Sequence, residues 1–131
     1  MTGPRRDIPE VMAALDIFLF TSLWGEGFGL VVIEAMASEK AVVALNTGPM
    51  REIVKNGVTG WLPAPTEWVP EISSLDITPV VDTLRRLIHD RALRWEAGRA
   101  ARADIITRFG VRRVVERTAE TYTRIYHHYY G

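Results

Sequence analysis

The chain has 131 residues, the size of one ordinary domain, and can bury a sizeable core. Its 16 basic and 16 acidic side chains cancel, which argues against a nucleic-acid partner, and a hydrophobic fraction of 47% argues against disorder. There is no cysteine, which excludes disulfides, thiolate metal sites and a cysteine nucleophile, and no apolar run approaches the length that spans a bilayer. These features predict a soluble, cytoplasmic globular domain.

The chain begins with short apolar runs that alternate with helical segments. We expect a helix over 8–15, with Asp7 as its N-cap, and a buried strand over 16–22, which is rich in β-forming residues. The glycine-rich stretch Gly-Glu-Gly-Phe-Gly at 25–29 follows. A helix is then predicted from about Gly29 to residue 38, because this stretch holds no helix breaker.

The same alternation continues to residue 62. The pattern predicts a second strand over 41–45, a short helix over 50–55 and a third strand over 58–62. Strands that alternate with helices are typical of a parallel sheet with right-handed connections. The sequence therefore predicts an α/β fold: a partial Rossmann-like parallel sheet of about three strands, with helices on both faces.

The second half is predicted to be helical. Thr78 is expected to cap a helix with Pro79 at its first position, and a longer helix over 91–109 is expected to be closed by Gly110. The last helix, over 111–130, has an apolar face of the kind that packs against another surface. This face consists of Val111, Val114, Val115, Thr118, Tyr122, Ile125, Tyr126 and Tyr129.

Two carboxylates bracket the glycine-rich stretch and the start of its helix. A helix that begins near Gly29 presents N–H groups and partial positive charge, and it would lie at the carboxyl end of a strand, which favours phosphate. Glu26 and Glu34 would repel phosphate unless they bind something else, and hydroxyl groups are the natural choice. A nucleotide sugar combines a diphosphate with two polyhydroxylated groups. The residues therefore indicate a nucleotide-sugar site.

Three stretches carry a resemblance to a known family. Residues 13–17 (Ala-Ala-Leu-Asp-Ile), 25–30 (Gly-Glu-Gly-Phe-Gly-Leu) and 34–38 (Glu-Ala-Met-Ala-Ser) resemble the donor domain of glycosyltransferase family 4. These group 1 enzymes have the GT-B architecture and transfer sugar from a nucleotide diphosphate sugar to an acceptor hydroxyl with retention of configuration. The match continues through Asn-Gly-Val-Thr-Gly at 56–60 and weakens after that.

The resemblance implies roles for individual residues. Glu26 would contact the transferred sugar and orient it, the backbone around Phe28 would hold the distal phosphate, and Glu34 would hold the ribose hydroxyls. The family generally uses no metal, so no cofactor is expected beyond the nucleotide sugar. The candidate site residues are therefore Glu26 as the catalytic residue, and Gly27, Phe28, Gly29, Leu30 and Glu34 as substrate-binding residues.

Both carboxylates also have a structural interpretation. Glu34 lies in an otherwise apolar helix, so we expect it to be buried and therefore to need a partner, either a ribose or an arginine or lysine. Glu26 could be an ordinary solvated acid of a surface segment.

Compared with the family, the chain has Glu39-Lys40-Ala41 where Gly-Lys-Pro is usual, and it matches only the C-terminal part of such enzymes. The acceptor domain and the basic pair that grips the diphosphate would then lie outside these residues. We therefore expect a single truncated donor-binding domain over 1–131, with an α/β half-sheet at 1–62, a proline-rich loop at 63–78 and a helical region at 79–131. Such a chain would lack stand-alone activity.

The truncation would leave one edge of the strand at 16–22 without a neighbour, and that edge is apolar. The chain is then expected to form a homodimer or to pair with the missing N-terminal portion. An alternative function is a non-catalytic interaction module that pairs through this edge and the last helix. A nucleotide-sugar epimerase is a third interpretation, but its catalytic acids would have to come from the missing domain.

Overall fold

The computed structural model describes residues 3–23, 27–63 and 75–130. At its centre are two parallel strands, β1 (Ile17–Phe20) and β2 (Ala41–Ala44), paired with Ile17 opposite Ala41 and Phe20 opposite Ala44. The predicted third strand is reduced to a bridge at Trp61, whose N–H donates to Val42 O and whose carbonyl accepts from Ala44 N, both at 2.9 Å. β2 therefore lies between β1 on one side and Trp61 on the other.

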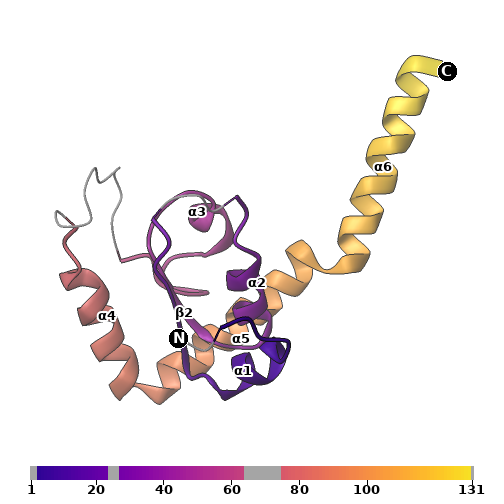
Figure 1. Ribbon diagram of the computed structural model, residues 1–131. Helices are drawn as coiled ribbons and strands as arrows, with labels where there is room; N and C mark the ends of the chain where they lie inside the picture. Colours follow the sequence, from indigo (N-terminus) through magenta and orange to yellow (C-terminus); the bar gives the residue numbers. More distant parts are fainter. Residues whose placement is uncertain (1–2, 24–26, 64–74, 131) are drawn as a thin grey trace.

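The described residues form six helices, of which the last extends away from the strands (Figure 1). They are α1 (Ile8–Ala14), α2 (Leu30–Ala37), α3 (Met50–Ile53), α4 (Thr78–His89), α5 (Arg91–Phe109) and α6 (Val111–Tyr130). Each lies within about two residues of its predicted range. The largest difference is at α3, which was expected to reach residue 55 and ends at Ile53.

The strands have helices on both faces, as predicted. Successive side chains of a strand point to opposite faces, so Val42 and Ala44 face one cluster, and Val43 and Leu45 face another. The first cluster is completed by residues from α2, α3 and α5, and the second by residues from α4. Figure 1 shows α4 on one side of β2 and α2 on the other. The α/β fold class is confirmed.

Two predicted helix ends differ in detail, and a third is as expected. The side chain of Asp7 does not cap α1, because its carboxylate pairs with Arg5. Thr78 is the first residue of α4 and not its cap, and Asp76 Oδ1 accepts from its N–H at 2.9 Å. Gly110 closes α5, as expected, with φ −59°. A Cβ there would lie 2.5 Å from Ile106 O, which explains the glycine by close approach.

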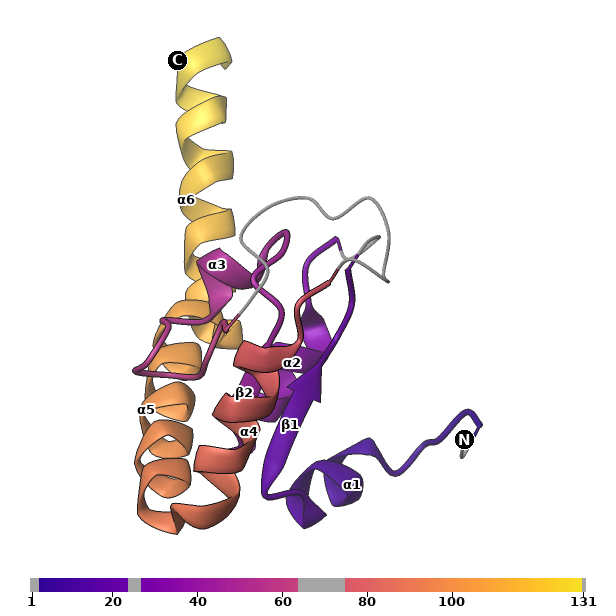
Figure 2. The ribbon, with the colours of Figure 1, turned by 90° about the vertical axis from the view of Figure 1, so that its left-hand side faces the viewer.

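The amphipathic helix α6 leaves the rest of the molecule (Figures 1 and 2). None of its residues is buried. The predicted apolar face therefore exists but is not covered. The accessible surface of the chain is 9279 Å², whereas a compact chain of this mass exposes about 7,000 Å². No helix among the described residues is both long and apolar enough to cross a bilayer.

Candidate functional site

The carboxyl ends of β1 and β2 lie at the same edge of the sheet because the strands are parallel. Leu45 N donates to Phe20 O at 3.1 Å, directly beyond the paired strands. The hydroxyl of Thr47 then donates to Ser22 O, also at 3.1 Å. The segments that follow the two strands are therefore tied together where open α/β sheets bind their ligands.

The N-terminus of α2 is at this edge. Gly29 is its N-cap, with φ +84°, and its carbonyl accepts from Val32 N at 3.0 Å. Glycine adopts this left-handed conformation without the cost that a Cβ imposes. The first N–H groups of any α-helix have no acceptor within the helix, so they can bind an anion in front of it. The predicted helix start at Gly29 is confirmed.

Residue 29 also lies close to two side chains, whose ends would have to move to admit a larger residue. A Cβ there would lie 2.5 Å from Met50 Cε and 3.2 Å from Ile53 Cδ1. Because both side chains belong to α3, this short helix rests directly against the start of α2. The left-handed turn and the close approach of α3 therefore coincide at one residue, and the positive φ is what favours glycine there.

A charged network fastens α3 to α5. Arg108 donates to the carbonyls of Glu52 and Ile53 and pairs with Asp104 at 2.7 Å, and Lys55 pairs with Asp104 at 2.6 Å. The side chain of Asp104 is only 11% exposed. Burial raises the pKa of Asp104, but the hydrogen bonds and charges of Lys55 and Arg108 outweigh it, so this pKa lies below its usual value. The network holds α3 in place beside the α2 N-terminus.

Phe28 and Leu30 are both exposed at the start of α2. The Phe28 ring lies edge-to-face on Phe109, with ring centroids 5.8 Å apart. This contact anchors the stretch before α2 to the end of α5. A side chain at Gly27 would meet nothing within 4 Å, so this position is open.

Glu34 is exposed, which overturns the expectation that it is buried. The buried residues of α2 are Val32, Ala35 and Met36, and Glu34 lies on the opposite side. The exposure of Glu34 could not be predicted from the apolar composition of the helix, because the composition does not show which side of the helix faces the core. Within the described part of the chain, no salt bridge engages Glu34.

Glu34 nevertheless stays close to the helix start. It lies four residues after Leu30, which is itself 64% exposed, so the two share one face of α2. They are separated by about 6 Å along the helix axis. The structure thus brings together Phe28, Gly29, Leu30 and Glu34. Glu26, together with Trp24 and Gly25, lies outside the described residues.

Arg51 lies at the same edge of the sheet, and the sequence did not single it out. Its Nε donates to Asn46 Oδ1 at 2.8 Å, and its Nη2 donates to Asn46 O at 3.3 Å. Asn46 follows β2, so these bonds hold the guanidinium at the carboxyl edge of the sheet. A short helix such as α3 leaves no periodic pattern that would identify this position.

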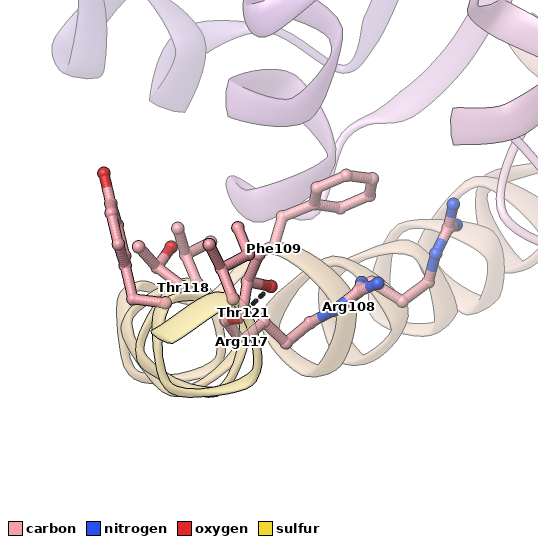
Figure 3. Close-up of a pocket in the computed structure, with 8 residues that line it drawn as sticks. Arg108, Phe109, Arg117, Thr118 and Thr121 are labelled. Carbon is pink, nitrogen blue, oxygen red and sulfur yellow. Dashed lines mark hydrogen bonds between the residues drawn. The ribbon is translucent and has the colours of Figure 1, made fainter. Parts of the chain in front are cut away.

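A groove of about 540 Å³ lies between the end of α5 and α6 (Figure 3). Figure 3 shows Phe109 reaching from α5 over the groove, with Arg117, Thr118 and Thr121 on α6. Thr121 Oγ1 donates to Arg117 O at 2.8 Å. The groove adjoins the candidate site through the contact between Phe109 and Phe28.

The sequence model of one family, described as "Glycosyl transferases group 1", matches residues 1–104. N-acetyl-alpha-D-glucosaminyl L-malate synthase of Bacillus anthracis is 30% identical over 120 residues, which are 92% of this chain and 29% of that protein. Sulfoquinovosyl transferase SQD2 of Arabidopsis thaliana is 36% identical over 101 residues, which are 75% of this chain and 18% of that protein.

Solved structures are similar over the same length. Anabaena HepE in complex with UDP and glucose aligns with a TM-score of 0.77 at 33% identity, over 92% of this chain and 30% of HepE. The C-terminal domain of LpcC, a group 1 glycosyl transferase family protein of Francisella tularensis, aligns with a TM-score of 0.65 at 31% identity, over 85% of this chain and 52% of that one. This chain spans about 30% of HepE and of the Bacillus anthracis enzyme.

Proposed function

The chain belongs to the group 1 glycosyl transferases, and from that premise we propose that its carboxyl edge binds a nucleotide-sugar donor. The observation that carries the proposal is the α2 N-terminus, which Gly29 opens toward the common end of the two parallel strands. The anionic diphosphate suits this position, because N–H groups and partial positive charge are present there before the ligand arrives. The complex of HepE with UDP and glucose supports the same class of ligand.

The proposed roles follow the geometry of α2. The backbone of Gly27, Phe28, Gly29 and Leu30 binds the distal phosphate, and Glu34 accepts hydrogen bonds from the ribose hydroxyls. Support for the role of Glu34 comes from its exposure and from its position one turn beyond Leu30. Glu26 contacts the transferred sugar, a role that rests on the family resemblance alone.

For the whole protein we propose transfer of the sugar to an acceptor hydroxyl with retention of configuration, in the cytoplasm and without a metal. The absence of cysteine suits a reducing compartment. These 131 residues hold part of the donor site, and we expect no turnover from them alone, because the relatives are about three times as long. The division into 1–62, 63–78 and 79–131 remains a proposal, and 64–74 lie outside the described residues.

The test is an amide NMR titration of the isotope-labelled chain with UDP-glucose, GDP-glucose and ADP-glucose. We expect the amides of 27–34 to shift saturably with one of the three donors. In Glu34→Ala the affinity for that donor should fall about tenfold, because one charge-assisted contact is lost. Glu116→Ala, which removes an exposed acid from α6, should leave the affinity unchanged. If no donor moves these amides in a folded sample, the proposed site is wrong.

We also propose that two copies of the chain pair with each other, through the edge of β1 and the apolar face of α6. In the described part of the chain, β2 is the only strand beside β1, and Leu19 of β1 is exposed. The chain exposes about 2,000 Å² more than a compact chain of its mass, whereas a standard interface needs about 800 Å² per partner. This pairing is also what the interaction-module alternative requires.

A further inference from the structure

A diphosphate bound at the α2 N-terminus would bring negative charge that must be neutralised. Both of its phosphates are ionised at neutral pH, and Glu34 adds a negative charge one turn along the same helix. The helix N-terminus offers only about half of a positive charge. A cationic side chain at this edge of the sheet would therefore strengthen binding considerably.

Arg51 is placed to supply that charge. It follows Met50, whose side chain lies against Gly29 at the start of α2. Its guanidinium is held by the two oxygens of Asn46 at 2.8 and 3.3 Å. Thr47, the next residue after Asn46, donates to Ser22 at the exit of β1. Arg51 is thus hydrogen-bonded to the segment after β2, which Thr47 ties to the segment after β1, and it follows the residue that packs against the start of α2.

Arg108 is the other arginine that binds α3, but it has a different task. Its guanidinium pairs with Asp104 and donates to the carbonyls of Glu52 and Ile53, so it fastens α3 to α5. Arg51 lies at the opposite, N-terminal end of α3 and is exposed. An arginine has a planar fork of N–H donors that matches two phosphate oxygens, and its charge does not titrate near neutral pH.

We propose that Arg51 donates hydrogen bonds to the diphosphate of the bound nucleotide sugar and adds positive charge beside the α2 N-terminus, in addition to the basic pair that the family resemblance implies. This inference rests on the proposed function, because it presupposes that the donor binds at this edge. It assigns to Arg51 a role in affinity for the phosphates, separate from the roles of Glu26 and Glu34 toward hydroxyl groups.

The experiment separates the phosphates from the rest of the ligand. UDP, GDP and ADP are titrated into the full chain by NMR, each beside its nucleoside, which lacks the phosphates. In Arg51→Gln we expect the affinity for the preferred diphosphate to fall about tenfold, while nucleoside affinity stays within twofold. The dependence of diphosphate affinity on salt should also weaken. Arg86→Gln, which removes an exposed arginine from α4, serves as the matched control and should change neither affinity.

Each outcome has a distinct meaning. If the unmodified chain binds no diphosphate, the proposed function fails and this inference fails with it. If it binds one and Arg51→Gln binds it equally well, only the role of Arg51 is wrong. Equal losses for diphosphate and nucleoside would show a general structural effect and overturn the inference. Arg51→Met keeps much of the side-chain length but removes the charge, and it must show the same selective loss of diphosphate affinity. It also serves as the test if Arg51→Gln does not fold.

Discussion

Positive φ angles occur at glycines such as Gly29, and at one residue that has a side chain, Glu39 at the far end of α2 from the site. Glu39, two residues after the end of α2, has φ +58°, and it is the one residue other than glycine with positive φ in the described ranges. Its carbonyl lies under Gly98 of α5, where a Cβ would come within 2.2 Å. The close approach of α5 therefore fixes the backbone conformation at Glu39. The resembled family usually has a glycine here, and glutamate is strained in this conformation.

Replacing Glu39 by glycine should stabilise the protein. A left-handed backbone costs a residue with a Cβ about 1–2 kcal/mol, which glycine avoids. The greater freedom of glycine in the unfolded chain offsets roughly 0.5–1 kcal/mol of this stabilisation. The contact of Glu39 with Arg102, at 3.7 Å and half-exposed, contributes little. We expect Glu39→Gly to raise the free energy of unfolding in urea by about 0.5–1 kcal/mol. Glu39→Ala keeps the strain and should show no gain; a less stable Glu39→Gly variant would contradict this account.

Short elements at the site depend on their neighbours for their position. The helix α3 has only four residues, too few to be stable alone, and its place is set by Met50 and Ile53 against Gly29 and by Arg108 on its last carbonyls. Asp104 on α5 holds both Arg108 and Lys55. The element that carries Arg51 is therefore positioned by charges on a helix about 50 residues later in the chain.

This dependence predicts a pH effect on stability. The folded-state pKa of Asp104 is depressed, so its stabilising contribution is complete above the pKa of the unfolded chain and is lost as pH falls through the folded value. At pH 7, Asp104→Asn should lower the free energy of unfolding by roughly 1–2 kcal/mol. Urea unfolding between pH 3 and 7 should show this deficit shrinking with acidification. Asp82→Asn breaks an exposed pair on α4 and should cost almost nothing at any pH.

At the scale of the whole molecule, the surface is larger than a compact chain needs. The helix α6 projects from the body with every residue exposed, and β1 has β2 on one side only in the described part of the chain (Figure 2). Apolar surfaces of this extent usually mark interfaces. The fold positions the candidate site on one portion of the molecule and leaves two other surfaces available for contacts.

Light scattering coupled to size exclusion should therefore give the mass of two chains at high concentration. The double variant Val115→Arg/Tyr122→Arg places two charges on the apolar face of α6 and should shift the mass toward one chain, since charges disrupt such a contact. Both residues are exposed, so folding should be unaffected. Glu116→Gln/Glu120→Gln changes the polar side of the same helix and should leave the mass unchanged. A single-chain mass for the unmodified protein would refute the proposed pairing.

The local pattern alone determined most of the elements. Strands, helices and the start of α2 at Gly29 could be predicted because apolar periodicity and glycine placement are local properties. The family could be identified because the glutamates and glycines at 25–38 stand at fixed spacings in the chain. Neither inference required knowledge of long-range contacts.

Only the tertiary structure decided which face of each element is buried. It placed Glu34 outside a helix that is apolar in composition, reduced the strand at 58–62 to a bridge at Trp61, and brought Arg51 to the carboxyl edge. It also showed that Gly110 and Gly98 serve close approach to other backbone atoms. The physical reason is that burial, sheet pairing and side-chain reach depend on segments far apart in sequence, which a local pattern does not contain.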